Sequence, residues 1–138
     1  DPITVRTKKD IVAPEISSIR VDNALLPGRT DRLQTVVSWR TDEPANSLVH
    51  FEEGVGIEEI LANKVGQEKE FTTDHIVIIT SLKPSTIYRI KIVSEDESGN
   101  EASSPIRSIL TPRSAESVID VITRNLQETF GFLKRLQR

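Results

Sequence analysis

The 138-residue chain contains no cysteine and no methionine, and aromatic residues make up only 4% of it. The absence of cysteine excludes disulfide bonds, zinc sites with thiolate ligands and cysteine nucleophiles. No apolar run approaches the roughly 20 residues that a membrane-spanning helix needs. Because the chain begins at Asp1 without an initiator methionine, we expect a processed or excised piece of a larger exported protein.

An excess of basic charge is also lacking, since 18 basic and 21 acidic residues give a net charge of −3. The chain therefore has no domain-wide basic field for nucleic acid, and we expect no nucleic-acid partner. Membrane contact within this segment is not expected either. With 36% hydrophobic and 28% charged residues, the composition is typical of one globular domain.

Short β-type runs dominate the chain up to Pro112. Apolar and polar residues alternate with period two at residues 33–40, 47–51 and 87–94, and further β-rich runs lie at 16–21, 75–80 and 106–111. Turn signals separate these runs, and Asp42-Glu43-Pro44 is expected to end the second one. Residues 57–70 are ambiguous between a turn or two of helix and a loop with a short edge strand. The pattern predicts an antiparallel sandwich or barrel.

After Pro112 the apolar spacing changes to steps of three and four, and Ser114 can cap a helix. The resulting apolar stripe consists of Val118, Ile119, Ile122, Leu126, Phe130, Leu133 and Leu136. The sequence therefore predicts a C-terminal amphipathic α-helix within residues 113–138. It leaves open whether this helix packs on its own domain, associates with a second copy or binds another partner.

One stretch resembles a family signature. Leu82-Lys83-Pro84-Ser85-Thr86-Ile87-Tyr88 is similar to the Leu-x-Pro-x-Thr-x-Tyr motif of fibronectin type III domains, and Val37-Ser38-Trp39 resembles their strand B. The resemblance covers residues 13–112 and implies a seven-stranded Greek-key β-sandwich of antiparallel strands. It also implies a buried Trp39 and a Tyr88 hydroxyl that bonds to backbone upstream.

The stretch from Trp39 to Ala45 also resembles bacterial and archaeal surface domains, and the non-catalytic N-terminal domain of purple acid phosphatases. No metal-ligand motif of those enzymes carries over to this chain. We expect three regions: an N-terminal extended segment or linker at 1–12, the fibronectin type III-like domain at 13–112, and the helix at 113–138.

The polar clusters favour ordinary roles over chemistry. His50 and His75 are expected at the surface, each facing away from the core, and without the convergent ligands of a metal site. The acidic stretch 95–101 lacks the spacing of a calcium loop and is expected to be a solvated turn with Gly99 at positive φ. The pairs Glu52-Glu53 and Glu58-Glu59 are expected to form a charged, exposed rim. We therefore predict no catalytic residues, no cofactor and no metal.

A predicted apolar patch is the strongest functional signal. Strand alternation turns Val36, Ile76 and Ile78 outward on two neighbouring strands, where the C-terminal helix could cover them within one chain or between two chains. The predicted interaction surface comprises Val36, Ile76, Ile78, Ile119, Ile122, Leu126, Phe130 and Leu133.

These features favour a non-catalytic module for display, spacing or adhesion within a larger cell-envelope or secreted protein. Its partners would be a protein, adjacent domains of the same polypeptide, or a second copy through the helix. Two alternatives remain open: an accessory domain of an extracellular hydrolase, and a subunit of a homopolymeric surface assembly.

Overall fold

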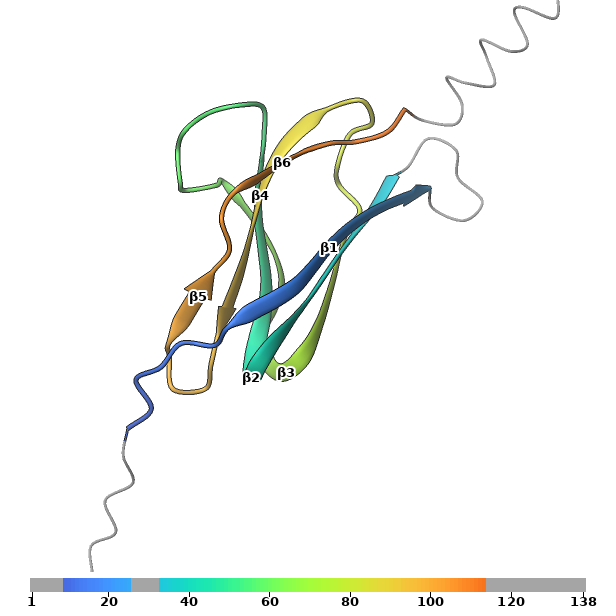
Figure 1. Cartoon of the computed structure of the whole chain (residues 1–138). Coiled ribbons are helices and arrows are strands. Elements are labelled where there is room, and N and C mark those ends of the chain that lie inside the picture. The colour runs from blue at the N-terminus through green and yellow to red at the C-terminus, as the bar shows by residue number, and fades with distance from the viewer. Residues whose placement is uncertain (1–8, 26–32, 114–138) are drawn as a thin grey trace, which may run out of the picture.

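The computed structural model describes residues 9–25 and 33–113, and its regular structure in these ranges is antiparallel β-sheet that curls on itself (Figure 1). The strands are β1 (Ile16–Leu25), β2 (Leu33–Glu53), β3 (Asn63–Ile79), β4 (Ile87–Glu95), β5 (Glu101–Ser103) and β6 (Arg107–Leu110). The expected all-β class is confirmed for these ranges. The predicted helix lies outside the described residues.

The curl comes from β2 and β3, which each take part in two sets of pairings. Residues 33–41 of β2 pair with β1 and with the end of β3, whereas residues 47–53 pair with β4 and with the start of β3. β4 carries the short strands β5 and β6 along its other side. The two parts of β2 therefore belong to different regions of the sheet, and the core forms between these regions.

The expected break at Asp42-Glu43-Pro44 is wrong, because β2 continues through it. The backbone stays extended there since it keeps partners on several sides. The Asp42 N–H donates to the Glu15 carbonyl, while Ala45 pairs with Thr72 of β3 and bridges to Asp96. The change of direction appears as shifts of register between Arg40 and Ser47.

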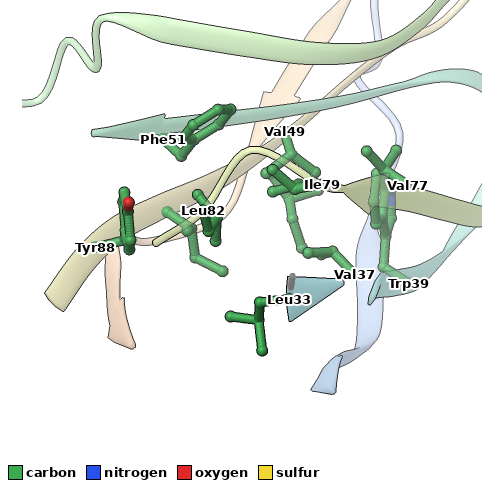
Figure 2. Close-up of a cluster of buried hydrophobic side chains, with 11 residues drawn as sticks. Leu33, Val37, Trp39, Val49, Phe51, Val77, Ile79, Leu82 and Tyr88 are labelled. Carbon is green, nitrogen blue, oxygen red and sulfur yellow. The ribbon is translucent and has the colours of Figure 1, made fainter. Parts of the chain in front are cut away.

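The core is built from alternating side chains of β2, β3 and β4, which converge in the space between the strands (Figure 2). Trp39 and Tyr88 are both buried, as predicted. The cluster comprises Leu33, Val37, Trp39, Val49, Phe51, Val77, Ile79, Leu82, Tyr88, Ile90 and Ile92. Burial of these apolar side chains is the main driving force for folding.

Hydrogen bonds fix the turn before β4. The Lys83 N–H donates to the Tyr88 hydroxyl at 2.9 Å, which is the upstream backbone contact expected for this tyrosine. The Thr111 hydroxyl donates to the Lys83 carbonyl at 2.6 Å, and it accepts from the Thr86 N–H. The turn is thus tied both to β4 and to the residue that follows β6.

The ambiguous stretch 57–70 contains no helix: a loop reaches Leu61, and β3 begins at Asn63. The expected last strand at 106–111 is β6, and sequence reasoning missed the short β5 before it. The turn between β4 and β5 has Gly99 at φ 88°, as predicted.

Residues 9–15 run along one end of the sheet, and Pro14 among them is buried. Ile11 and Val12 are exposed, but the Asn100 side-chain amide donates to the Asp10 carbonyl, and the Glu15 N–H donates to Asp42. The part of the predicted linker at residues 1–8 lies outside the described residues.

Candidate functional site

The structure places one part of the predicted interaction surface, namely Val36, Ile76 and Ile78. The five helix residues of this surface, Ile119, Ile122, Leu126, Phe130 and Leu133, lie outside the described residues. Ile76 is 68% exposed and Ile78 is 48% exposed, while Val36 is half-buried. Ile78 is the register partner of Val36, and Ile76 is the partner of Ser38 beside it. The three aliphatic side chains therefore share the outer face of β2 and β3.

Polar residues border this patch. Arg40 and Asp74 form an ion pair at 2.8 Å between β2 and β3, and the bond to Asp74 raises the pKa of Arg40. A hollow of about 310 Å³ lies next to Ile76, between this pair and Ser18 of β1. Ser18 has a φ of 54°, at the irregularity where β1 shifts register. The patch is thus an apolar strip beside a recess that both polar and apolar side chains line.

A second surface is formed by the loop after β2. Arg89 of β4 alternates with the core residues Tyr88 and Ile90 and so lies on the opposite face of the strand, where the loop covers it. Its guanidinium donates to Glu52 at 3.1 Å and to both the carboxylate and the carbonyl of Glu58. This bonding lowers the pKa of the Glu58 carboxyl, with a backbone hydrogen bond within the loop as the larger cause.

The loop holds apolar side chains in solvent although it is well anchored. Leu61 is buried and Lys91 donates to the Glu59 carbonyl, yet Ile57 is 97% exposed and Ile60 is 87% exposed. A groove of about 500 Å³ separates the loop from the stretch between β5 and β6. The expected charged rim at Glu52 and Glu58 is therefore partly an anchor for Arg89.

A cluster of carboxyl groups forms at the end of the sheet where the N-terminal segment passes. Oxygens of Asp10, Glu43 and Asp96 lie within 4.8 Å of one another. Asp96 is buried, so the expectation of a fully solvated turn is wrong at this residue. It accepts bonds from the Ser98 and Asn100 N–H groups and from the Asn100 amide.

The surroundings shift the pKa values of Asp96 and Glu43 in opposite directions. The Asn100 side-chain bond is the main cause that lowers the pKa of Asp96, against the effect of burial. Burial raises the pKa of Glu43, and the negative charges of Asp10 and Asp96 add to this effect. Carboxylate oxygens suit a hard cation such as Ca²⁺, but three residues supply fewer than the six to eight oxygens that it takes. We assign no ion to the cluster.

The expectation that His75 faces away from the core is wrong, because the residue is buried, with 1% of its surface exposed. His75 is the register partner of Trp39 and has the same strand parity as Val77, so it must point inward. His50 is half-buried. Burial lowers its pKa, and Lys91 and Lys64 add to that effect.

His75 and Ser47 form a buried serine–histidine pair at 2.6 Å. A nucleophile of this kind needs substrate access and a group that orients the histidine, usually a carboxylate. Both side chains are buried here, and the other ring nitrogen contacts the Thr41 hydroxyl. We therefore interpret the pair as a structural contact.

Sequence reasoning missed three features that depend on tertiary contacts: the burial of His75, the burial of Arg89 and the meeting of Asp10 with Glu43 and Asp96. The sequence gave a signal only for the burial of His75, because strand alternation places it on the same face as Val77 and Ile79. Arg89 is covered by a loop about 30 residues away, and the carboxyl cluster joins three segments.

Comparisons with protein-family models, with curated proteins and with solved structures give no match to this chain. In the part of the chain that the structure describes, no helix is long and apolar enough to cross a membrane.

Proposed function

We propose that the chain is a fibronectin type III-like β-sandwich. In this assignment β1, the first part of β2 and the last part of β3 form one layer. The start of β3, the second part of β2, β4, and β5 with β6 counted as one strand form the other, which gives seven strands. The Tyr88 hydroxyl bond to Lys83 and the buried Trp39 support the assignment.

We further propose a non-catalytic module for display, spacing or adhesion in a larger cell-envelope or secreted protein. The observation that carries the proposal is the patch of Val36, Ile76 and Ile78. These side chains do not belong to the buried core cluster. A contiguous aliphatic cluster on a sheet face usually marks a surface that another element covers.

The proposed cover is the amphipathic segment at residues 114–138, through Ile119, Ile122, Leu126, Phe130 and Leu133. It would pack on the patch of its own chain or of a second copy. Burial of three or four such side chains would contribute several kcal/mol, on the order of 1.5–3 kcal/mol for each one that is fully buried. This contribution is a large fraction of the free energy of unfolding of a small domain.

A thermodynamic cycle tests this contact. We would replace Ile76 and Ile78 by threonine, which retains β-branching, in the full chain and in residues 1–113, and measure urea unfolding of all four proteins. The proposal predicts that the replacement destabilises the full chain by at least about 1 kcal/mol more than the shortened one.

Ile57→Thr and Ile60→Thr are the matched control, since these isoleucines are exposed but lie on the loop. They should lower the free energy of unfolding by the same amount in the full chain and in residues 1–113. If Ile76→Thr and Ile78→Thr also cost the same with and without residues 114–138, the segment does not cover the patch.

A further inference from the structure

His75 joins the two parts of β2 through one buried ring. Its Nε2 lies 2.8 Å from the Thr41 hydroxyl, before the bend, and its Nδ1 lies 2.6 Å from the Ser47 hydroxyl, after the bend. The ring stacks on Trp39, with centroids 4.9 Å apart and planes within 7°. The Trp39 indole in turn donates to the Ser94 hydroxyl of β4. His75 therefore holds together the point where the sheet curls.

The hydroxyl partners assign the protons on the ring. The Thr41 hydroxyl lies 2.7 Å from the Glu43 carbonyl and 3.4 Å from the Thr72 carbonyl, and assigning its single proton to these carbonyls leaves its oxygen to accept from His75. Nε2 therefore carries the hydrogen. Nδ1 is then a free lone pair that accepts from the Ser47 hydroxyl.

We propose that His75 makes the fold sensitive to acid: protonation of Nδ1 reverses the bond to Ser47, leaves the Ser47 hydroxyl hydrogen without an acceptor and loosens the packing between the bend of β2 and β3. A second proton on Nδ1 would meet the Ser47 oxygen, and the Ser47 hydroxyl would have to turn its hydrogen away. Among the described residues, the hydroxyl has no other hydrogen-bond partner, and the site is buried. Protonation would thus leave a buried donor unpaired, in addition to burying a charge.

The nearby charges do not make the protonated form of His75 the favoured one. Burial lowers the pKa of His75, and the negative charge of Asp74 works in the other direction. Asp74 is itself paired with Arg40, which weakens its effect on the ring. The face of the Trp39 indole would favour a cation, which offsets part of the loss. Asp10 of the N-terminal segment, Asp42 and Glu43 of the bend, and Asp96 of the turn after β4 add negative charge at this end of the sheet.

The sign of the pH dependence follows from proton linkage. A histidine whose pKa is lowered by folding binds fewer protons in the folded state than in the unfolded state. The stability is complete above the unfolded pKa of about 6.5 and falls as the pH decreases towards the lowered folded pKa. Glu43 acts oppositely in the acid range, because its raised pKa favours the folded state as the pH falls.

The single tryptophan provides a direct readout, because a protonated imidazole stacked on an indole quenches its fluorescence. We would titrate the folded full chain from pH 8 to pH 4.5 and measure urea midpoints at pH 7.5 and pH 5.0. Matched variants are His75→Gln, His50→Gln and Glu43→Gln. We expect a fluorescence transition with a midpoint below about 6.5 and a lower urea midpoint at pH 5.0. Both effects should persist in His50→Gln and Glu43→Gln.

His75→Gln should lose the fluorescence transition and most of the fall in urea midpoint. The proposal would be overturned if the urea midpoint of His75→Gln fell between pH 7.5 and pH 5.0 as much as that of the native chain. It would also be overturned if the native chain had the same midpoint at both pH values. Imidazole ¹⁵N shifts of the native chain give an answer even if His75→Gln does not fold. They should show the hydrogen on Nε2 at pH 7.5 and a folded-state transition below about 6.5. A hydrogen on Nδ1, or titration at or above that pH, contradicts the proposal.

Discussion

The Tyr88 hydroxyl and the Thr111 hydroxyl stabilise one turn from two sides. Tyr88 accepts from the Lys83 N–H, and Thr111 donates to the Lys83 carbonyl, so both backbone polar groups of Lys83 have side-chain partners. The tyrosine ring packs edge-on against Phe51, with centroids 6.5 Å apart. One residue thus links the turn to the core.

Replacement of Tyr88 by phenylalanine should lower the free energy of unfolding by about 1–2 kcal/mol. The ring keeps its packing, but the Lys83 N–H loses its acceptor. Urea unfolding measures the change. Lys83→Ala is the control, because it retains the backbone N–H and removes only an exposed ion pair with Glu53, and it should change stability by less than about 0.5 kcal/mol. Equal effects of the two substitutions would contradict this role of the hydroxyl.

At the residue scale, local pattern predicted side chains whose neighbours are set by alternation along one strand. Trp39 and Tyr88 are buried as expected, and Ile76 and Ile78 face outward. The prediction for His75 was wrong because a polar side chain was expected at the surface, although strand alternation places His75 on the same face as the buried Val77. Two hydroxyl partners and the Trp39 ring make its burial possible, and alternation within one strand does not identify these partners.

The pairing of β2 with β3 depends on one glycine. Gly66 has a φ of 139° and lies opposite Leu48 in the register. A Cβ atom built at this position would come within 1.9 Å of the Ser47 carbonyl oxygen. Any side chain here must therefore push the two strands apart.

We predict that Gly66→Ala destabilises the domain by roughly 1–3 kcal/mol more than Gly54→Ala. Both glycines have positive φ, at 139° and 96°, but a Cβ at Gly54 meets no atom within 4 Å. The difference between the two variants isolates the clash with β2 from backbone strain. Thermal or urea unfolding of both variants measures it, and equal losses would show that the strands accommodate the methyl group.

At the element scale, the sequence predicted where strands lie better than where they end. Proline at 44 signals a break because it lacks an N–H group, but β2 passes through it at the bend between its two sets of partners. Whether a chain stops or bends there depends on neighbours such as Thr72 and Asp96, which are distant in sequence. The short β5 gave no periodic signal because it has three residues.

For the whole molecule, composition and strand spacing were enough to predict an antiparallel all-β domain. They did not predict how the outer faces are covered, because this depends on loops and termini. The loop over Arg89 and the N-terminal segment beside Asp96 show two such coverings. The patch at Ile76 is left uncovered within the described residues.

The most direct test of the proposed interaction surface is a paramagnetic label on the C-terminal segment. Since the chain has no cysteine, Gln127→Cys provides a single site for a spin label. If residues 114–138 cover the patch, the label should broaden the methyl NMR signals of Ile76 and Ile78 more than those of Ile57 and Ile60. Dilution of labelled with unlabelled protein distinguishes contact within one chain from contact between two chains. Unbroadened Ile76 and Ile78 signals in the full chain, or stronger broadening at Ile57, would contradict the proposal.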